Sequence, residues 1–163
     1  MNVVVLADTH VMVGGSRELP DSVYLALDSA DVILHAGDVL ARGLLDELAS
    51  YAPVHAVLGN NDDAELAASL PEVVELDLDG VALAMVHDSG PTAGRPRRMH
   101  RRFPDAQIVI YGHSHAPFDG EGVDGQILFN PGSPTQRRRQ PFPTFGRLSI
   151  EAGRIEHRTI ATI

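Results

Sequence analysis

The sequence contains no cysteine and no lysine, and only 5% of its 163 residues are aromatic. Without cysteine there can be no disulfide, thiolate catalysis or cysteine-ligated zinc. A metal would have to be held by His, Asp, Glu or Asn, which suit hard or borderline divalent ions. Without lysine, every basic side chain is a planar guanidinium. Five Phe, three Tyr and no Trp offer no series of rings for base stacking, so we expect no stable nucleic-acid complex.

Long hydrophobic runs are also missing. No apolar segment is long enough to span a bilayer and no basic, apolar leader opens the sequence, so we expect a cytoplasmic protein without membrane contact. Hydrophobic residues make up 44% of the chain, which is enough for one domain over residues 1–163. The net charge of −9 is uneven, because residues 1–94 carry 16 acidic side chains and residues 95–163 carry 11 of the 13 arginines. Bound cations would offset part of that acidity.

The first 70 residues alternate between short apolar runs and amphipathic segments. This alternation predicts parallel strands joined by right-handed helical crossovers. The strands are expected at 2–7, 31–35 and 53–58, and the helices at 19–30, 42–51 and just before Pro71.

The second half of the chain is richer in strands. Asp79-Gly80 between two apolar runs is typical of a two-residue hairpin turn. Together with the first half, this pattern predicts an α/β fold in which two β-sheets pack against each other with helices outside. The expected elements are strands at 73–78 and 81–86, a basic helix at 95–103, and strands at 107–111, 126–129, 144–150 and 154–160.

Metal-ligating residue types follow five of the predicted strands. Ligands in such sheets bind beyond the carboxyl ends of the strands, so we expect these side chains to meet. In His113-Ser114-His115, an extended step would point both imidazoles to one side, and a turn would still keep them close. Two ions about 3.5–4 Å apart that share a carboxylate would use all seven residues. These residues are Asp8, His10, Asp38, Asn60, His87, His113 and His115.

The same blocks, in the same order, resemble the metallophosphoesterase (calcineurin-like phosphoesterase) superfamily over nearly the whole chain. They are Asp8-Thr9-His10, Gly37-Asp38, Gly59-Asn60-Asn61-Asp62, His87 and Gly112-His113-Ser114-His115. The short chain and the turn Asn130-Pro131-Gly132-Ser133 resemble the small prokaryotic phosphodiesterase branch. The resemblance implies an αββα sandwich, two mixed β-sheets flanked by helices.

The resemblance also implies a dinuclear site with a bridging hydroxide as nucleophile. One ion would be held by Asp8, His10, Asp38 and His115, and the other by Asp38, Asn60, His87 and His113. We expect Mn²⁺, with Ni²⁺, Fe²⁺ or Zn²⁺ as alternatives, because such ligands accept all four ions. The catalytic residues would be Asn60, Asn61, Asp62 and His113.

Two positions depart from the family pattern. Asn61 stands where larger members carry a histidine near the leaving group, and an amide cannot act as a general acid. That favours substrates with good leaving groups. Asp88 stands where glycine usually follows the metal-binding histidine, and it would orient His87, add charge or crowd the second ion. Candidate substrate contacts are Asn61, Arg95, Arg98, His100 and Arg138, although solvated surface is the ordinary role of such arginine clusters.

These patterns favour a metal-dependent phosphodiesterase acting on a small phosphate ester. Two alternatives stay open. One is a phosphomonoesterase. The other is a protein-binding scaffold with vestigial catalysis, because the sequence is also similar to the retromer scaffold subunit. Every ligand position is filled here, which argues against a decayed site. A homo-oligomer is compatible with the resemblance.

Overall fold

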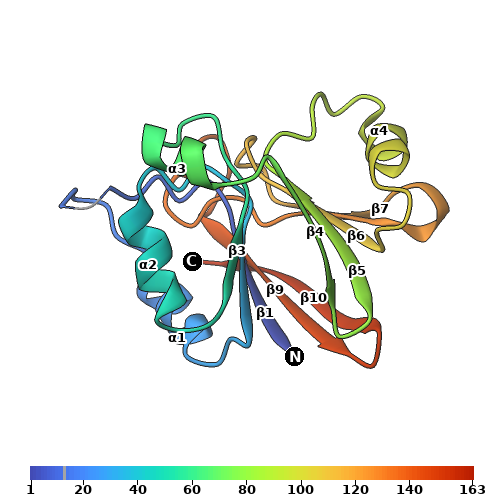
Figure 1. Ribbon diagram of the computed structural model, residues 1–163, viewed down its shortest axis with the longest axis horizontal. Helices are drawn as coiled ribbons and strands as arrows, with labels where there is room; N and C mark the ends of the chain where they lie inside the picture. Colours follow the sequence, from blue (N-terminus) through green and yellow to red (C-terminus); the bar gives the residue numbers. More distant parts are fainter. Residues whose placement is uncertain (13) are drawn as a thin grey trace.

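The computed structural model describes residues 1–12 and 14–163, and two five-stranded sheets face each other in it (Figure 1). The strands of the first sheet are β1 (Asn2–Leu6), β2 (Val32–His35), β3 (Val54–Ala56), β9 (Thr144–Glu151) and β10 (Arg154–Thr162). Those of the second are β4 (Val73–Leu78), β5 (Val81–Val86), β6 (Ile108–Tyr111), β7 (Phe118–Glu121) and β8 (Ile127–Asn130). The helices are α1 (Asp21–Leu27), α2 (Arg42–Ala49), α3 (Ala64–Ser69) and α4 (Arg95–Arg102), with a 3₁₀ turn at Val123–Gly125.

Both sheets are mixed, as the resemblance implies. The first has the order β10-β9-β1-β2-β3, and its β1, β2 and β3 are parallel. The second has the order β4-β5-β6-β8-β7, and its β5, β6 and β8 are parallel. The Leu78–Val81 pair confirms the predicted hairpin turn at Asp79-Gly80, where both residues have positive φ.

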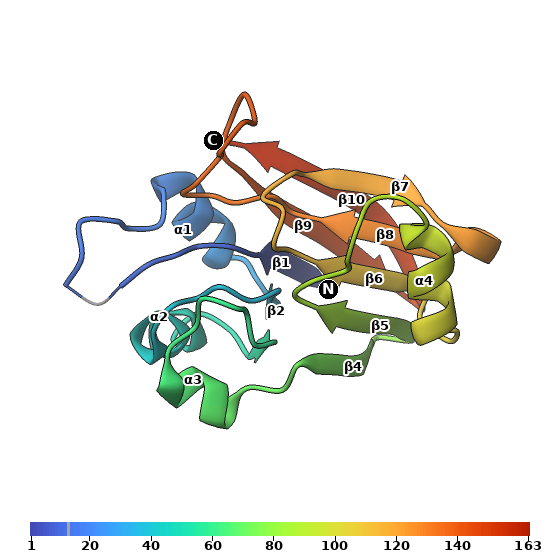
Figure 2. The same cartoon turned by 90° about the horizontal axis from the view of Figure 1, so that it is seen from above.

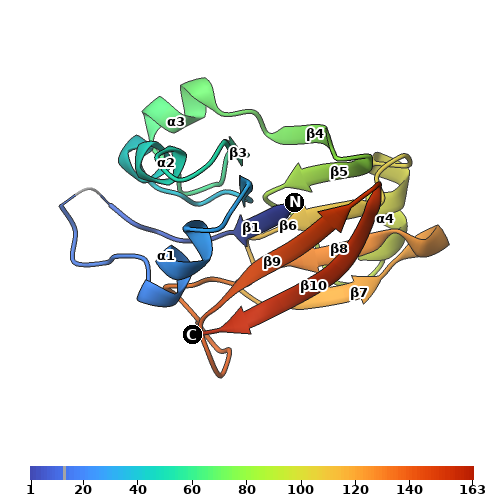
Figure 3. The same cartoon turned by 90° about the horizontal axis from the view of Figure 1, so that it is seen from below.

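Alternation along β1 shows how the layers are held together. Val3 and Val5 pack between the two sheets, while Val4 and Leu6 pack under α1 and α2. A strand buried on both faces needs an uninterrupted apolar run, which is why this segment contains three valines. On the outer face of the second sheet, Met99 and Phe103 place α4 against β5 and β6. Figures 2 and 3 show the resulting αββα arrangement, with α1 and α2 beside the first sheet and α4 beside the second.

Three elements differ clearly from the sequence-based expectations, and one of them is β3, which covers only Val54–Ala56 of the strand expected at 53–58. The helix expected at 19–30 covers only Asp21–Leu27, because the Asp31 amide must already donate to the Asn2 carbonyl at the start of the sheet. Strand β7 was not predicted. Its sequence, Phe-Asp-Gly-Glu, has low strand propensity, and only pairing with β8 holds it at the sheet edge.

The parallel strands of both sheets point their carboxyl ends toward the same end of the sandwich (upper side of Figure 1). The loops that carry the predicted ligands therefore meet there. Among the described residues, no helix is both long and apolar enough to cross a membrane.

Candidate metal centre

Backbone hydrogen bonds join the loops at this end of the sandwich. The amide of Asp8 donates to the Gly37 carbonyl at 2.9 Å, and the amide of His10 donates to the Asp38 carbonyl at 3.1 Å. In the second sheet, the amide of Gly112 donates to the His87 carbonyl at 3.0 Å. These bonds hold neighbouring loops of each sheet together. The backbone therefore brings the side chains of these loops close to one another.

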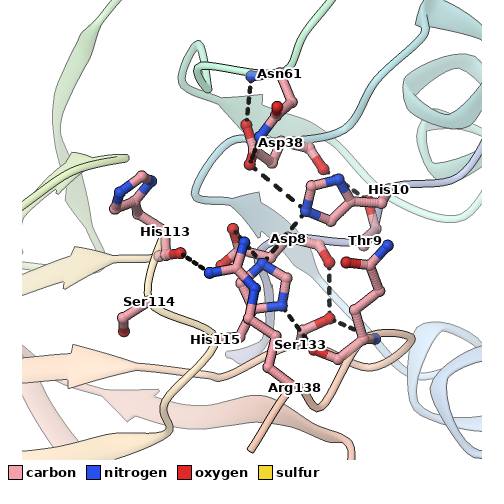
Figure 4. A network of polar contacts seen from close by, with 12 residues as sticks. Asp8, Thr9, His10, Asp38, Asn61, His113, Ser114, His115, Ser133 and Arg138 are labelled. Atoms are coloured by element: carbon pink, nitrogen blue, oxygen red, sulfur yellow. Dashed lines mark hydrogen bonds and ion pairs between the residues drawn. The ribbon is translucent and has the colours of Figure 1, made fainter.

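One cluster of ligand-type atoms lies at the end of β1 (Figure 4). The Nε2 atoms of His10 and His115 are 3.3 Å apart. Asp38 Oδ2 lies 3.5 Å from His10 Nε2, and Asp8 Oδ1 lies 3.4 Å from His115 Nε2. All four residues are buried. This is the set that the resemblance assigns to one ion.

A second cluster lies beside the first and shares Asp38. Its other carboxylate oxygen, Oδ1, is 3.5 Å from His87 Nε2. The side-chain oxygen of Asn60 lies 3.0 Å from His87 Nε2 and 2.9 Å from His113 Nδ1. One carboxylate thus faces both clusters, and all seven predicted ligands are brought together.

Two backbone carbonyls orient the imidazoles of two candidate ligands. His115 Nδ1 lies 2.6 Å from the Gln136 carbonyl, and His87 Nδ1 lies 2.7 Å from the Ala36 carbonyl. A carbonyl oxygen only accepts hydrogen bonds, so Nδ1 must carry the proton in both rings. In a neutral ring, Nε2 then presents its lone pair to the cluster, which is the tautomer that a metal ion requires.

The donor set fits a cation on evidence within the structure. With Nδ1 as donor, the Nε2 lone pair of neutral His115 faces other acceptors, including an Asp8 carboxylate oxygen 3.4 Å away. Both carboxylate oxygens of Asp8 are buried without a hydrogen-bond partner in the described residues. Acceptors facing one another in a buried site are costly unless a proton or a cation lies between them. The ligand atoms of Asp8, His10 and His115 all lie within 4.8 Å of one another, as do those of Asp8, Asp38 and His87.

Titration in this cluster reflects the same crowding. With no cation beside it, burial and then the Asp38 carboxylate raise the pKa of Asp8 to about 8. Burial lowers the pKa of His10 below its ordinary value and lowers that of His115 to about 4. Near pH 7 these two imidazoles are therefore neutral ligands, while the Asp8 carboxyl holds a proton that a cation would displace.

Asn61 and Asp62 serve the shared carboxylate and its loop. Asn61 donates to both oxygens of Asp38, from its amide nitrogen at 2.9 Å and from Nδ2 at 2.7 Å. Burial alone would raise the pKa of Asp38, but these two bonds and the nearby histidines outweigh it and lower the pKa. Asp62 accepts from the Gly59 and Leu40 amides, so both side chains hold the site's frame. The cap of α3 is the neighbouring Asp63.

The ligand loops hold unusual backbone conformations. Asp8, His10, Asp38, His113 and His115 all have φ between 47° and 65°, in the left-handed region. The extended step considered for His113-Ser114-His115 is therefore wrong, and the residues form a turn whose imidazoles go to different clusters. Each left-handed non-glycine residue costs roughly 1–2 kcal/mol, and such strain gathers at functional sites.

Glycine is required where the loops come closest. A Cβ at Gly59 would overlap the backbone nitrogen and Oδ1 of Asp38. One at Gly112 would lie 2.9 Å from the Ala36 carbonyl oxygen and 3.0 Å from Asp8 Oδ2. Both glycines therefore allow a ligand carboxylate to approach a neighbouring loop.

Three side chains that were predicted to contact the substrate interact with other parts of the protein instead. Arg95 donates to the Tyr111 hydroxyl and the Gly90 carbonyl, and Arg98 donates to carbonyls of the 89–93 loop. His100 Nε2 faces Asp124 on the 3₁₀ turn at 3.4 Å. The three side chains are thus committed to packing α4, and the structure does not bring them into the ligand clusters.

Asp88 forms a hydrogen bond within its own loop, whereas Arg138 contacts one of the candidate ligands. Asp88 is exposed and accepts from the Gly90 amide at 2.7 Å, while the Ala36 carbonyl orients His87. Arg138 does reach the site, because its Nη1 donates to the His113 carbonyl at 3.2 Å (Figure 4).

Sequence reasoning missed the loop that holds the ligands from the far side. Ser133 donates to the Asp8 carbonyl at 2.7 Å, Thr135 donates to the Thr9 carbonyl, and Gln136 orients His115. The Asn130-Pro131-Gly132-Ser133 turn was a visible signal for part of this loop. Gln136 acts through its backbone carbonyl, which no residue type can reveal.

We expect cation binding to release a proton from Asp8. At pH 7 the addition of Mn²⁺ to chelator-treated protein should release about one proton from the cluster of Asp8, His10 and His115, because the two imidazoles are already neutral and Asp8 must ionise. The apparent affinity should rise with pH up to about 8 and then level off. Calorimetry in buffers of different ionisation enthalpy measures this release. Its persistence in Asp8→Asn, or its absence at pH 7, would contradict the assignment.

Comparisons with known proteins give consistent matches. The model of the calcineurin-like phosphoesterase superfamily domain matches residues 1–153. A "Probable metallophosphoesterase" of Methanothermobacter thermautotrophicus is 30% identical over 164 residues, covering 99% of this chain and 93% of the relative. Wild-type Vps29 of Entamoeba histolytica, solved with Zn²⁺, has a TM-score of 0.78 at 23% identity, covering 100% of this chain and 98% of that one. A structure described as a novel archaeal phosphodiesterase has a TM-score of 0.71 at 20% identity, covering 99% and 100%. At these identities the two structures establish the fold alone.

Proposed function

Because the chain belongs to the calcineurin-like phosphoesterase superfamily, we propose that it is a phosphodiesterase that works with two divalent cations, Mn²⁺ first among them. The observation that carries this proposal is the convergence of acceptor atoms around Asp38, where both carboxylate oxygens of Asp8 have no hydrogen-bond partner among the described residues. The substrate is a small phosphate ester.

The ligand sets follow the two clusters. Asp8, His10, Asp38 and His115 would hold one cation, and Asp38, Asn60, His87 and His113 the other. When bound, the ions would supply Lewis acidity that lowers the pKa of water toward 7 and neutralises charge on the phosphoryl oxygens.

The residues of the chain prepare this chemistry. Asp38 is presented as a carboxylate, because Asn61 donates to both of its oxygens. His87 and His115 are held with Nε2 facing the clusters by carbonyls that cannot rotate away. The amide of Asn60 adds an oxygen ligand without adding negative charge, so the ions would stay electrophilic. Preorganised groups of this kind cost little reorganisation when the reaction occurs.

A diester with a good leaving group suits these residues best. Asn61 replaces the histidine of larger family members, and its side-chain amide, which donates one N–H to Asp38, cannot act as a general acid. The departing oxygen therefore receives no proton from this position, which favours leaving groups that are stable as anions. The likeness in fold to an archaeal phosphodiesterase supports the same choice over a monoester.

The test is hydrolysis of bis-p-nitrophenyl phosphate by chelator-treated protein, with Mn²⁺ restored. We expect metal-dependent hydrolysis that is faster for this diester than for p-nitrophenyl phosphate. Faster hydrolysis of the monoester would favour a phosphomonoesterase. If the protein binds none of Mn²⁺, Ni²⁺, Fe²⁺ and Zn²⁺ by metal analysis, the scaffold alternative replaces the proposal.

His113 and His115 should serve different ions, although only one residue separates them. Removal of either imidazole by substitution to alanine should lower the bound Mn²⁺ from about two ions per chain to about one. The double variant should bind none, because each cluster has then lost a ligand. A double variant that still binds one ion would show that both histidines serve the same cation, which contradicts the division. Metal content after dialysis measures all three variants.

A further inference from the structure

Charge is distributed unequally around the two clusters. Two arginines adjoin the loops that carry His10 and His115: Arg17 donates to the His10 carbonyl, and Arg138 donates to the carbonyl of His113, two residues before His115. Beyond Asn60 and His87, the site opens into a surface hollow whose charged lining is Glu72, Asp88 and Arg102. One end of the site therefore carries two positive side chains, and the other carries two negative side chains against one positive.

Arg138 is the nearer of the two arginines. It donates from Nη1 to the His113 carbonyl, and in the part of the chain that the structure describes this is its one hydrogen bond. A guanidinium has five N–H donors, so most of them stay available to a ligand. The residue is exposed, and its bond to the His113 carbonyl holds its guanidinium at the 113–115 turn, which also carries His115 of the first cluster.

Arg17 is tied to the same cluster from another loop. Its Nη1 donates to the His10 carbonyl at 2.9 Å. The side-chain amide of Gln136, with its oxygen turned toward Arg17, accepts from Nη1 at 2.6 Å and from Nη2 at 3.0 Å. The backbone of the same Gln136 orients His115. One residue therefore fixes both a metal-ligand candidate and a guanidinium beside it.

We propose that Arg17 and Arg138 form an anion subsite, which selects phosphodiesters that carry a second anionic group, a phosphate or a carboxylate, on one ester arm. This inference rests on the proposed function, because it concerns the substrate of the same site. A guanidinium binds either group through paired N–H donors. At the opposite end, Glu72 and Asp88 repel such a group, so the charged arm has one favourable direction.

Two matched substrates test the subsite. Both are phosphodiesters with p-nitrophenol as the leaving group. The second ester group, which stays on the phosphate after hydrolysis, is a neutral propyl group in one substrate and an anionic 2-carboxyethyl group in the other. The ratio of kcat/KM for the charged arm over the neutral arm is read within each variant, so that a general loss of activity cancels. We expect a wild-type ratio of roughly tenfold, as one charged hydrogen bond allows, and a fall toward one at high salt.

Arg138→Gln should bring the ratio close to one, and Arg17→Gln should lower it about threefold because Arg17 acts mainly through its charge. Arg139→Gln is the control, because Arg139 is an exposed neighbour of equal charge.

Calorimetric dissociation constants for 3-phosphonopropionate and butylphosphonate should rank the variants in the same order without turnover. A wild-type ratio near one, or the same ratio in the wild type and all variants, would overturn the anion subsite. If the propyl diester is still hydrolysed in that case, the proposed phosphodiesterase activity stands. Absence of hydrolysis for both substrates overturns both.

Discussion

Asp38→Asn is expected to reduce Mn²⁺-dependent hydrolysis of bis-p-nitrophenyl phosphate by at least about 10³-fold, because a shared ligand supplies several kcal/mol to transition-state stabilisation. Asp38 faces both ligand clusters with its two carboxylate oxygens, Oδ2 toward His10 and Oδ1 toward His87. An amide at this position offers one oxygen and no charge. It would also turn an N–H group toward one of the clusters, so both ions would bind more weakly.

Asp88→Asn is the matched control for this substitution. It makes the same chemical change within one residue of His87, but Asp88 is exposed and accepts only from the Gly90 amide in the described part of the chain. We expect its metal content and its hydrolysis of this diester, whose arms carry no second anionic group for Asp88 to repel, to stay within about threefold of the wild type. Comparable losses in the two variants would mean that Asp38 has no special place in catalysis.

Gly59→Ala is expected to lower the free energy of unfolding by about 3 kcal/mol and to abolish high-affinity metal binding. The added Cβ would overlap the backbone nitrogen and Oδ1 of Asp38, so the 59–62 loop must move away. That movement also displaces Asn60 and the donors of Asn61. For a chain of this size the melting temperature should fall by roughly 6–12 °C.

Gly94→Ala separates this steric effect from the ordinary cost of replacing glycine. Gly94 has φ of 72° at the start of α4, and a Cβ there meets no heavy atom of the described residues within 4 Å. Its cost should be the left-handed strain alone, about 1–2 kcal/mol, with metal content unchanged. Thermal unfolding and metal analysis of both variants decide the point. Equal destabilisation by both substitutions, with metal retained in both, would contradict the close-approach role of Gly59.

The fold and the convergence of the candidate metal ligands could be predicted because each rests on a strong local pattern. Apolar runs such as 2–7 predicted where the strands lie. Parallel strands bring their carboxyl ends together at one edge of a sheet, whatever the conformation of the loops. Asp8 and His87 come directly after the predicted strands 2–7 and 81–86, and Asp38 comes three residues after the strand 31–35, so the sequence alone indicated that they would meet. The Asp79-Gly80 turn was equally plain, because that dipeptide favours the conformation that a two-residue hairpin needs.

The remaining features depend on tertiary structure. The carbonyls of Ala36 and Gln136 orient two histidines, yet a backbone oxygen is the same in every residue type. Arginine-rich composition could not separate Arg95, which packs on Tyr111, from Arg138, which reaches the ligand clusters. Arg17 was invisible for a similar reason, because its place beside His10 follows from the path of a loop.

The most direct test of the central claim is a crystal structure with Mn²⁺, measured at the manganese absorption edge. We expect two anomalous peaks about 3.5–4 Å apart on either side of Asp38. One should lie among Asp8, His10 and His115, and the other among Asn60, His87 and His113. A single peak, or no peak from protein that hydrolyses the diester in solution, would contradict a dinuclear centre built on Asp38.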